Sequence, residues 1–117
     1  MNPTAGRQLR RDLDAVLAAA VKQRGPLVFD EVEEIAIAEA MIAADRAEQL
    51  RAAFDDELAG EARSSALTRL SAEARQCSVL AVTLARSVTK ELLAQPKSEM
   101  HQRAVRARWD NRGARHG

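Results

Sequence analysis

The side chains that most often carry out catalysis are few in this sequence and lie at uninformative spacings. His101 and His116 are the only histidines of the 117-residue chain, fifteen residues apart, with no thiol or carboxylate at metal-ligand spacing around them. Cys77 is the single cysteine and has no histidine at a motif spacing, which predicts a small core residue rather than a nucleophile. The acidic run 55–57 matches neither a calcium loop nor a paired-carboxylate site. We therefore expect a protein with no enzymatic activity, no metal site and no cofactor.

Arginine offers a different chemistry, because several arginines gather near the start of the chain. Arg7 shares a helical face with Arg10 and also with Arg11, since residues three and four apart are neighbours on a helix. Such a cluster binds phosphates without reading bases. A complete helix-turn-helix is not visible, because this segment ends at a Gly-Pro and an acidic segment follows. The expected partner is double-stranded DNA, and the candidate contacts are Arg7, Arg10, Arg11, Lys22 and Arg24.

A second basic segment, 97–117, forms a tail that we expect to be flexible by itself. Its arginines can bind DNA. Alternatively, Val105 and Trp109 can anchor a short helix in the groove of a partner, with the arginines forming a charged rim. A merely solubilising tail is the third interpretation. The residues concerned in the first two are Arg103, Val105, Arg106, Arg108, Trp109 and Arg112.

The composition predicts an all-α fold. Hydrophobic residues make up 46% of the chain and include 24 alanines, whereas aromatics are only 3% and tyrosine is absent. A β-sandwich or barrel needs β-branched and aromatic residues with frequent turn signals, which this chain lacks. No apolar run approaches the ~20 residues of a membrane span, and no secretion signal is visible. We therefore expect a location in the cytoplasm, without export.

Charge divides the chain into segments. Residues 1–25 carry a net charge of +3, residues 26–62 of −9, residues 63–96 of +3 and residues 97–117 of +4. The expected organisation is a basic N-terminal helix over 1–25, a helical-hairpin core over 26–96 and the basic tail over 97–117. Basic ends around such a core are typical of an assembly with polyanion-seeking termini.

Helix signals refine this organisation. Apolar residues at spacings of three and four predict a first helix over 7–24, which Gly25 and the following proline end. Asp30 and Glu33 form a capping-box pattern that begins a second helix, and this helix ends near Gly60. A third helix begins between 64 and 71 and ends before Pro96, with small residues along an unbroken apolar seam.

The two long helices share an apolar waist. The stretches 35–44 and 76–85 are nearly free of charge and lie opposite each other if the chain turns at Gly60. A helix that is apolar on nearly all sides must be buried on nearly all sides. We therefore expect lateral packing between subunits; the alternative is a four-helix bundle in which the first helix covers the waist. The candidate oligomerisation residues are Ile35, Ile37, Met41, Ile42, Leu80 and Leu84.

The order of these elements resembles a known family. The second helix carries IAADRAEQLRAAF, the third opens with AEARQ and continues SVLAVTLARSV, and the tail reads RAVRARWD. This pattern resembles small terminase subunits of tailed phages, in particular the group found in phages and prophages of actinobacteria. The sequence departs from many of them in lacking a separate N-terminal helix-turn-helix domain.

The resemblance implies a homo-oligomer, a closed ring of roughly eight to ten subunits. Such a ring recognises viral DNA and delivers it to the large terminase subunit, which carries the ATPase and the nuclease. The protein would then act in the cytoplasm of the bacterial host. Two other classes stay open: a small helical DNA-binding regulator or antitoxin-like dimer, and a coiled-coil scaffold without a nucleic-acid role. The number of subunits separates the dimer from the ring.

Overall fold

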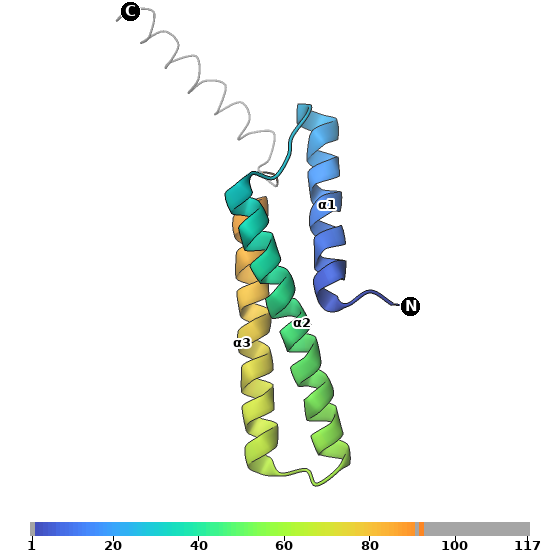
Figure 1. The fold of residues 1–117 in the computed structure, drawn as a ribbon, viewed down its shortest axis with the longest axis vertical. Helices are drawn as coiled ribbons and strands as arrows, with labels where there is room; N and C mark the ends of the chain where they lie inside the picture. Colours follow the sequence, from blue (N-terminus) through green and yellow to red (C-terminus); the bar gives the residue numbers. More distant parts are fainter. Residues whose placement is uncertain (1, 91, 93–117) are drawn as a thin grey trace, which may run out of the picture.

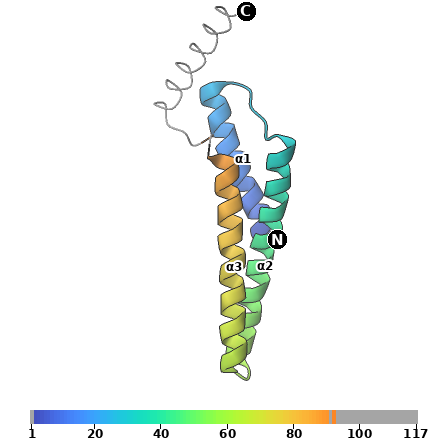
Figure 2. The ribbon, with the colours of Figure 1, turned by 90° about the vertical axis from the view of Figure 1, so that its left-hand side faces the viewer.

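The computed structural model describes residues 2–90 and 92, and all regular structure in these residues is helical. Helix α1 spans Ala5–Arg24, α2 spans Glu31–Ala59 and α3 spans Ser64–Thr89. Helices α2 and α3 form a long antiparallel hairpin, and α1 lies beside the half of it farther from the turn (Figure 1). The view turned by 90° shows that α1 begins near the middle of the hairpin and runs toward its open end (Figure 2). The predicted all-α hairpin with a shorter N-terminal helix is therefore confirmed.

The helix ends follow from local hydrogen bonds. Thr4 accepts a hydrogen bond from the backbone N–H of Arg7, so α1 begins two residues earlier than its apolar stripe indicates. Gly25 ends α1 at φ 91°, a conformation that glycine adopts without a Cβ clash. The capping box predicted for Asp30 and Glu33 is present in both directions.

The turn between α2 and α3 is compact and lies where the sequence predicts it. Gly60 donates to the carbonyl oxygens of Asp56 and Glu57, which closes the last turn of α2. Ala62 takes the left-handed conformation at φ 51°. The guanidinium of Arg63 then pairs with the Glu57 carboxylate at 2.6 Å, so an ion pair spans the turn.

The core has two parts of different character. Near the open end of the hairpin, large side chains from all three helices and the α1–α2 linker cluster together: Leu13, Phe29, Ile37 and Val88. Toward the middle, the buried positions of α2 and α3 are alanines, such as Ala43 and Ala81. Small residues let two helix backbones approach closely, as the seam of the third helix predicts.

The structure corrects one part of the expected oligomerisation surface. Ile37 is only 1% exposed, and Met41 is half-buried against the same core cluster, because α1 covers this side of α2. The alternative in which the first helix covers the waist is thus partly realised, with three helices in the described residues. Ile35 and Ile42 are 66% and 61% exposed and lie on an uncovered side.

Helix α1 approaches the α2 backbone closely at Gly6. The Gly6 backbone N–H donates to the Asp45 carboxylate at 2.7 Å, so a side chain of α2 satisfies an N–H group in the first turn of α1. A Cβ at Gly6 would lie 2.5 Å from the Met41 carbonyl oxygen. The close packing of α1 on α2 therefore requires a residue without a side chain at this position.

Candidate nucleic-acid interface

Three basic side chains lie on one outer face of α1. Viewed down an α-helix, residues four apart differ in direction by only about 40°, and residues eleven apart by only about 20°. Arg7, Arg11 and Lys22 therefore share a face, and all three are exposed. Ala15 and Ala18, also exposed, lie between Arg11 and Lys22 and leave that part of the face flat. The face is about 22 Å long from end to end.

Burial of the opposite side of α1 sets the direction of this basic face. Leu13 is buried in the core, and Leu9 and Leu17 pack against it from the same side of the helix. The residues half a turn away must then point to solvent. Among the described residues, no carboxylate pairs with the side chains of Arg7, Arg11 or Lys22. These cations are available to an external anion.

Arg10, which the sequence groups with Arg7 and Arg11 as a candidate DNA contact, lies outside this face. Its guanidinium forms a two-bonded pair with the Glu34 carboxylate, at 2.5 and 3.1 Å, and also contacts Asp14 at 3.1 Å. It lies 5.8 Å from the centroid of the Phe29 ring. Arg10 thus links α1 to α2 and to the linker between them, and its charge is already balanced.

The Arg10–Glu34 ion pair shifts the pKa of each partner in the direction that favours its charged form. The hydrogen bond from Arg10 lowers the pKa of Glu34, and the hydrogen bond to Glu34 raises the pKa of Arg10. The same happens across the hairpin turn, where hydrogen bonds from Arg63 lower the pKa of Glu57. Both carboxylates therefore stay ionised to lower pH than free glutamate does.

Arg24 differs from the three outer cations. It is the last residue of α1, is half-buried and already has an interaction partner. The cations on the outer face of α1 are therefore Arg7, Arg11 and Lys22. The tail residues proposed for DNA or partner binding, from Arg103 to Arg112, lie outside the described residues.

The remaining oligomerisation candidates are open to solvent to different degrees. Ile35 and Ile42 are well exposed on α2, Leu80 is 50% exposed on α3, and Leu84 is half-buried. Further large aliphatic side chains are at least half exposed: Val28, Val32, Leu58, Val79 and Val82. So many exposed aliphatic side chains on α2, α3 and the linker before α2 are typical of a surface that another chain covers.

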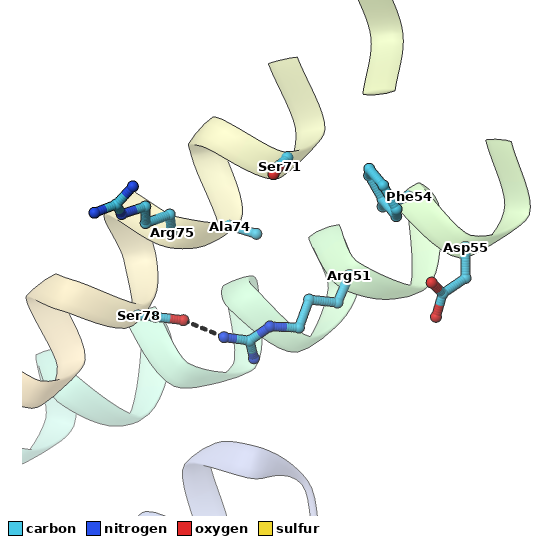
Figure 3. A pocket seen from close by; sticks show the side chains of 7 residues that line it. All are labelled: Arg51, Phe54, Asp55, Ser71, Ala74, Arg75 and Ser78. Atoms are coloured by element: carbon cyan, nitrogen blue, oxygen red, sulfur yellow. Dashed lines mark hydrogen bonds between the residues drawn. The ribbon is translucent and has the colours of Figure 1, made fainter. Parts of the chain in front are cut away.

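A groove made of two neighbouring pockets runs along the hairpin, one pocket beyond the N-terminal end of α1 and the other alongside the first turns of that helix. One part of about 390 Å³ lies between α2 and α3, with Phe54 and Ala74 in its lining (Figure 3). The neighbouring pocket, of about 420 Å³, reaches Ala5 of α1. Arg51 and Ser78 line both pockets. Arg51 extends across from α2 and donates to the Ser78 hydroxyl (Figure 3).

Sequence reasoning missed two features of this surface. The sequence does not predict the groove, because the groove requires that α1 begin near the middle of the hairpin and leave the half nearer the turn uncovered. The Gly6–Asp45 contact was also missed, because Gly6 lies just before the predicted helix, although a glycine at a helix start is a usable signal for close backbone approach. Neither feature carries reactive chemistry of its own.

The described residues hold no cluster of histidine, cysteine and carboxylate side chains able to bind a metal ion. Cys77 is a half-buried residue on α3. In the same part of the chain, no helix combines the length and apolar character needed to cross a membrane. Comparison with family models, with curated proteins and with solved structures found no match to this chain.

Proposed function

We propose that this chain is a non-enzymatic, oligomeric DNA-binding protein of the terminase small subunit type. The observation that carries the proposal is the outer face of α1, where Arg7, Arg11 and Lys22 point away from the core and form no ion pair with a carboxylate of the described residues. Asp14 also lies at this face, where it pairs with Arg10. A face of this kind contacts phosphates and carries no means of reading bases. It contributes affinity that depends on salt and little on sequence.

Assembly makes such a face effective. A single copy offers three cations, which is a weak site for a duplex at physiological salt. A ring repeats the same face around its axis, so several copies engage one duplex and the contacts add. The exposed aliphatic residues of α2 and α3 support this assembly.

The terminase assignment itself draws on the sequence resemblance. In this proposal the hairpin builds the ring, α1 contacts viral DNA, and the tail bearing Trp109 engages the large subunit or DNA. The large subunit then supplies the ATPase and nuclease activities. The hairpin with its separate basic helix is compatible with this division of roles.

The test is DNA binding measured by fluorescence anisotropy across a series of salt concentrations. The variant Arg7→Ala/Arg11→Ala should bind a random duplex more weakly and with a smaller salt slope, since each lost phosphate contact removes about 0.9 from that slope. The matched control is Arg69→Ala/Lys90→Ala, which removes two exposed cations from the α3 region. Equal losses in both variants would contradict the proposal.

Native mass spectrometry and a change of DNA sequence separate this function from a regulator. A closed oligomer with nearly equal affinity for unrelated duplexes supports the terminase type. A dimer that prefers one duplex by a large factor would instead indicate the regulator or antitoxin-like protein.

A further inference from the structure

Helix α2 carries an exposed apolar stripe that its own chain leaves uncovered. Val32, Ile35 and Ile42 are 74%, 66% and 61% exposed, and by helical spacing they lie within about 80° of arc. We call these three residues the α2 outer stripe. Glu39 lies inside this arc, between Ile35 and Ile42, and Glu31 lies at its edge, four residues before Ile35, so carboxylates accompany the aliphatic side chains of the stripe. Arg46 follows one turn beyond its end.

The groove described above has the complementary character. Its floor consists of small side chains such as Ala74 and Ala81, with Val82 beside them. Three arginines border it: Arg51, Arg75 and Arg86. Asp55 is the one carboxylate in the lining of these two pockets. An apolar floor with a basic border suits branched aliphatic side chains flanked by carboxylates.

The groove and the stripe of one copy cannot meet. Ile42 and Arg51 are nine residues apart on α2, which is two and a half turns, so they point to opposite sides of the helix. The stripe therefore needs a second molecule to cover it, and a copy of the same chain offers the matching groove. The basic tail fits this arginine-bordered groove poorly, because like charges repel.

We propose that the α2 outer stripe of one copy docks in the groove of the next copy. The two surfaces differ, so the contact is head-to-tail, and two joined copies have a free groove at one end and a free stripe at the other. A head-to-tail contact gives a closed ring when its rotation closes and a filament when it does not. This inference rests on the proposed function only for the existence of assembly, and DNA takes no part in it.

The test mixes two variants that each lose one surface. The stripe variant is Ile35→Asp/Ile42→Asp. The groove variant is Arg75→Glu/Val82→Asp, in which the new Asp lies four residues before Arg86 and can pair with it on the helix surface. All four positions are exposed, so circular dichroism should show unchanged helicity. Ala52→Asp and Ser65→Asp are controls at exposed positions outside both surfaces.

Sedimentation velocity without DNA gives the result. The wild type and both controls should assemble, whereas each variant alone should sediment as a monomer of 12.8 kDa. An equal mixture should form a one-to-one heterodimer and nothing larger, because the stripe variant retains its groove and the groove variant retains its stripe. A monomeric wild type, or a variant that assembles like the wild type, would overturn the inference.

A mixture that stays monomeric would also overturn it, because two variants that fail alone and fail together share one self-complementary interface. The outcome is independent of the DNA experiment. The monomeric stripe variant keeps Arg7, Arg11 and Lys22, so DNA binding through α1 is measured with it separately. A failure of the interface and a failure of DNA binding are thus distinguished.

Discussion

Gly6 is the residue on which the placement of α1 depends. Its N–H is held by Asp45, and its missing side chain lets the α1 backbone reach the Met41 carbonyl. Glycine in a helix interior normally costs about 0.5–1 kcal/mol relative to alanine. Its presence in the first turn of α1 is explained by this close approach.

The substitution Gly6→Ala reverses the usual sign of a glycine-to-alanine change. A Cβ placed 2.5 Å from a carbonyl oxygen must push α1 outward, so we expect a loss of about 1–3 kcal/mol in the free energy of unfolding, as for other overpacked sites. Urea denaturation followed by circular dichroism measures this loss. The control is Ala18→Gly, on the exposed side of α1, which should lose about 1 kcal/mol through helix propensity alone. A gain in stability for Gly6→Ala would show that the helices are farther apart.

Arg10 and Glu34 hold the other end of the α1–α2 contact and make it sensitive to acid. The pKa of Glu34 is lowered from its ordinary value of 4.5, because Arg10 donates hydrogen bonds to the ionised carboxylate. A carboxyl group with a lowered pKa in the folded state contributes stability above its unfolded pKa. That contribution is lost as the pH falls through the folded-state pKa.

We therefore expect Glu34→Gln to reduce the dependence of the melting temperature on pH below about 4.5. At neutral pH the variant should melt at a lower temperature than the wild type, and the two curves should approach each other in acid. Glu48→Gln removes an exposed carboxylate of α2 that has no ion pair among the described residues, and serves as the control. Parallel curves for wild type and Glu34→Gln would exclude the ion pair as the acid-sensitive link.

Helix α2 has apolar side chains on two sides, one buried within the chain and one exposed to solvent. One side, with Ile37, is covered by α1 and belongs to the core of the single chain. The other, with Ile35, faces solvent. The two positions are only two residues apart, so the same substitution at each compares folding with assembly in one helix.

Ile37→Ala should lower the free energy of unfolding by about 2–5 kcal/mol, because it leaves a cavity in the core cluster. Ile35→Ala should change the stability of the isolated chain by about 0.5 kcal/mol or less. Urea unfolding at low protein concentration gives both values. A large loss at Ile35, or none at Ile37, would mean that α1 covers the opposite side of α2 in solution.

At the scale of the whole molecule, the three helices separate the functions that we propose. Helix α1 presents cations outward, while α2 and α3 present apolar surfaces on both sides of the hairpin. These surfaces do not overlap, so a copy can contact its neighbours and DNA at the same time. The separation predicts that loss of assembly weakens DNA binding through lost multivalency and leaves the α1 face of each copy intact.

Local signals were sufficient for most of the fold. The capping box at Asp30, the glycine after α1 and the apolar spacing of all three helices depend on neighbouring residues, so they are readable in sequence. The hairpin was predictable too, because an acidic helix and a basic helix carry matching apolar stretches on either side of a short turn. These are short-range constraints, and the structure confirms them.

The candidate site was only partly predictable. Arg7 and Arg11 share a face by helical spacing alone, but Arg10 satisfies the same spacing and still points toward Glu34, a residue far away in sequence. Ile35 and Ile37 are both isoleucines in one uncharged stretch, and no local rule states which of them α1 will cover. That choice comes from the packing angle of α1, which the Gly6–Asp45 contact sets.

The helices, their ends, the hairpin and the basic character of α1 are readable in the sequence, because each follows from residues within a few turns of one another. Tertiary packing sets which apolar side of α2 is core, which arginine is held in an ion pair and where the groove lies. Those outcomes depend on contacts between residues 24 to 39 positions apart, such as Arg10–Glu34 and Gly6–Asp45. Long-range packing, in which alternatives of equal hydrophobicity compete, is the physical reason for the difference.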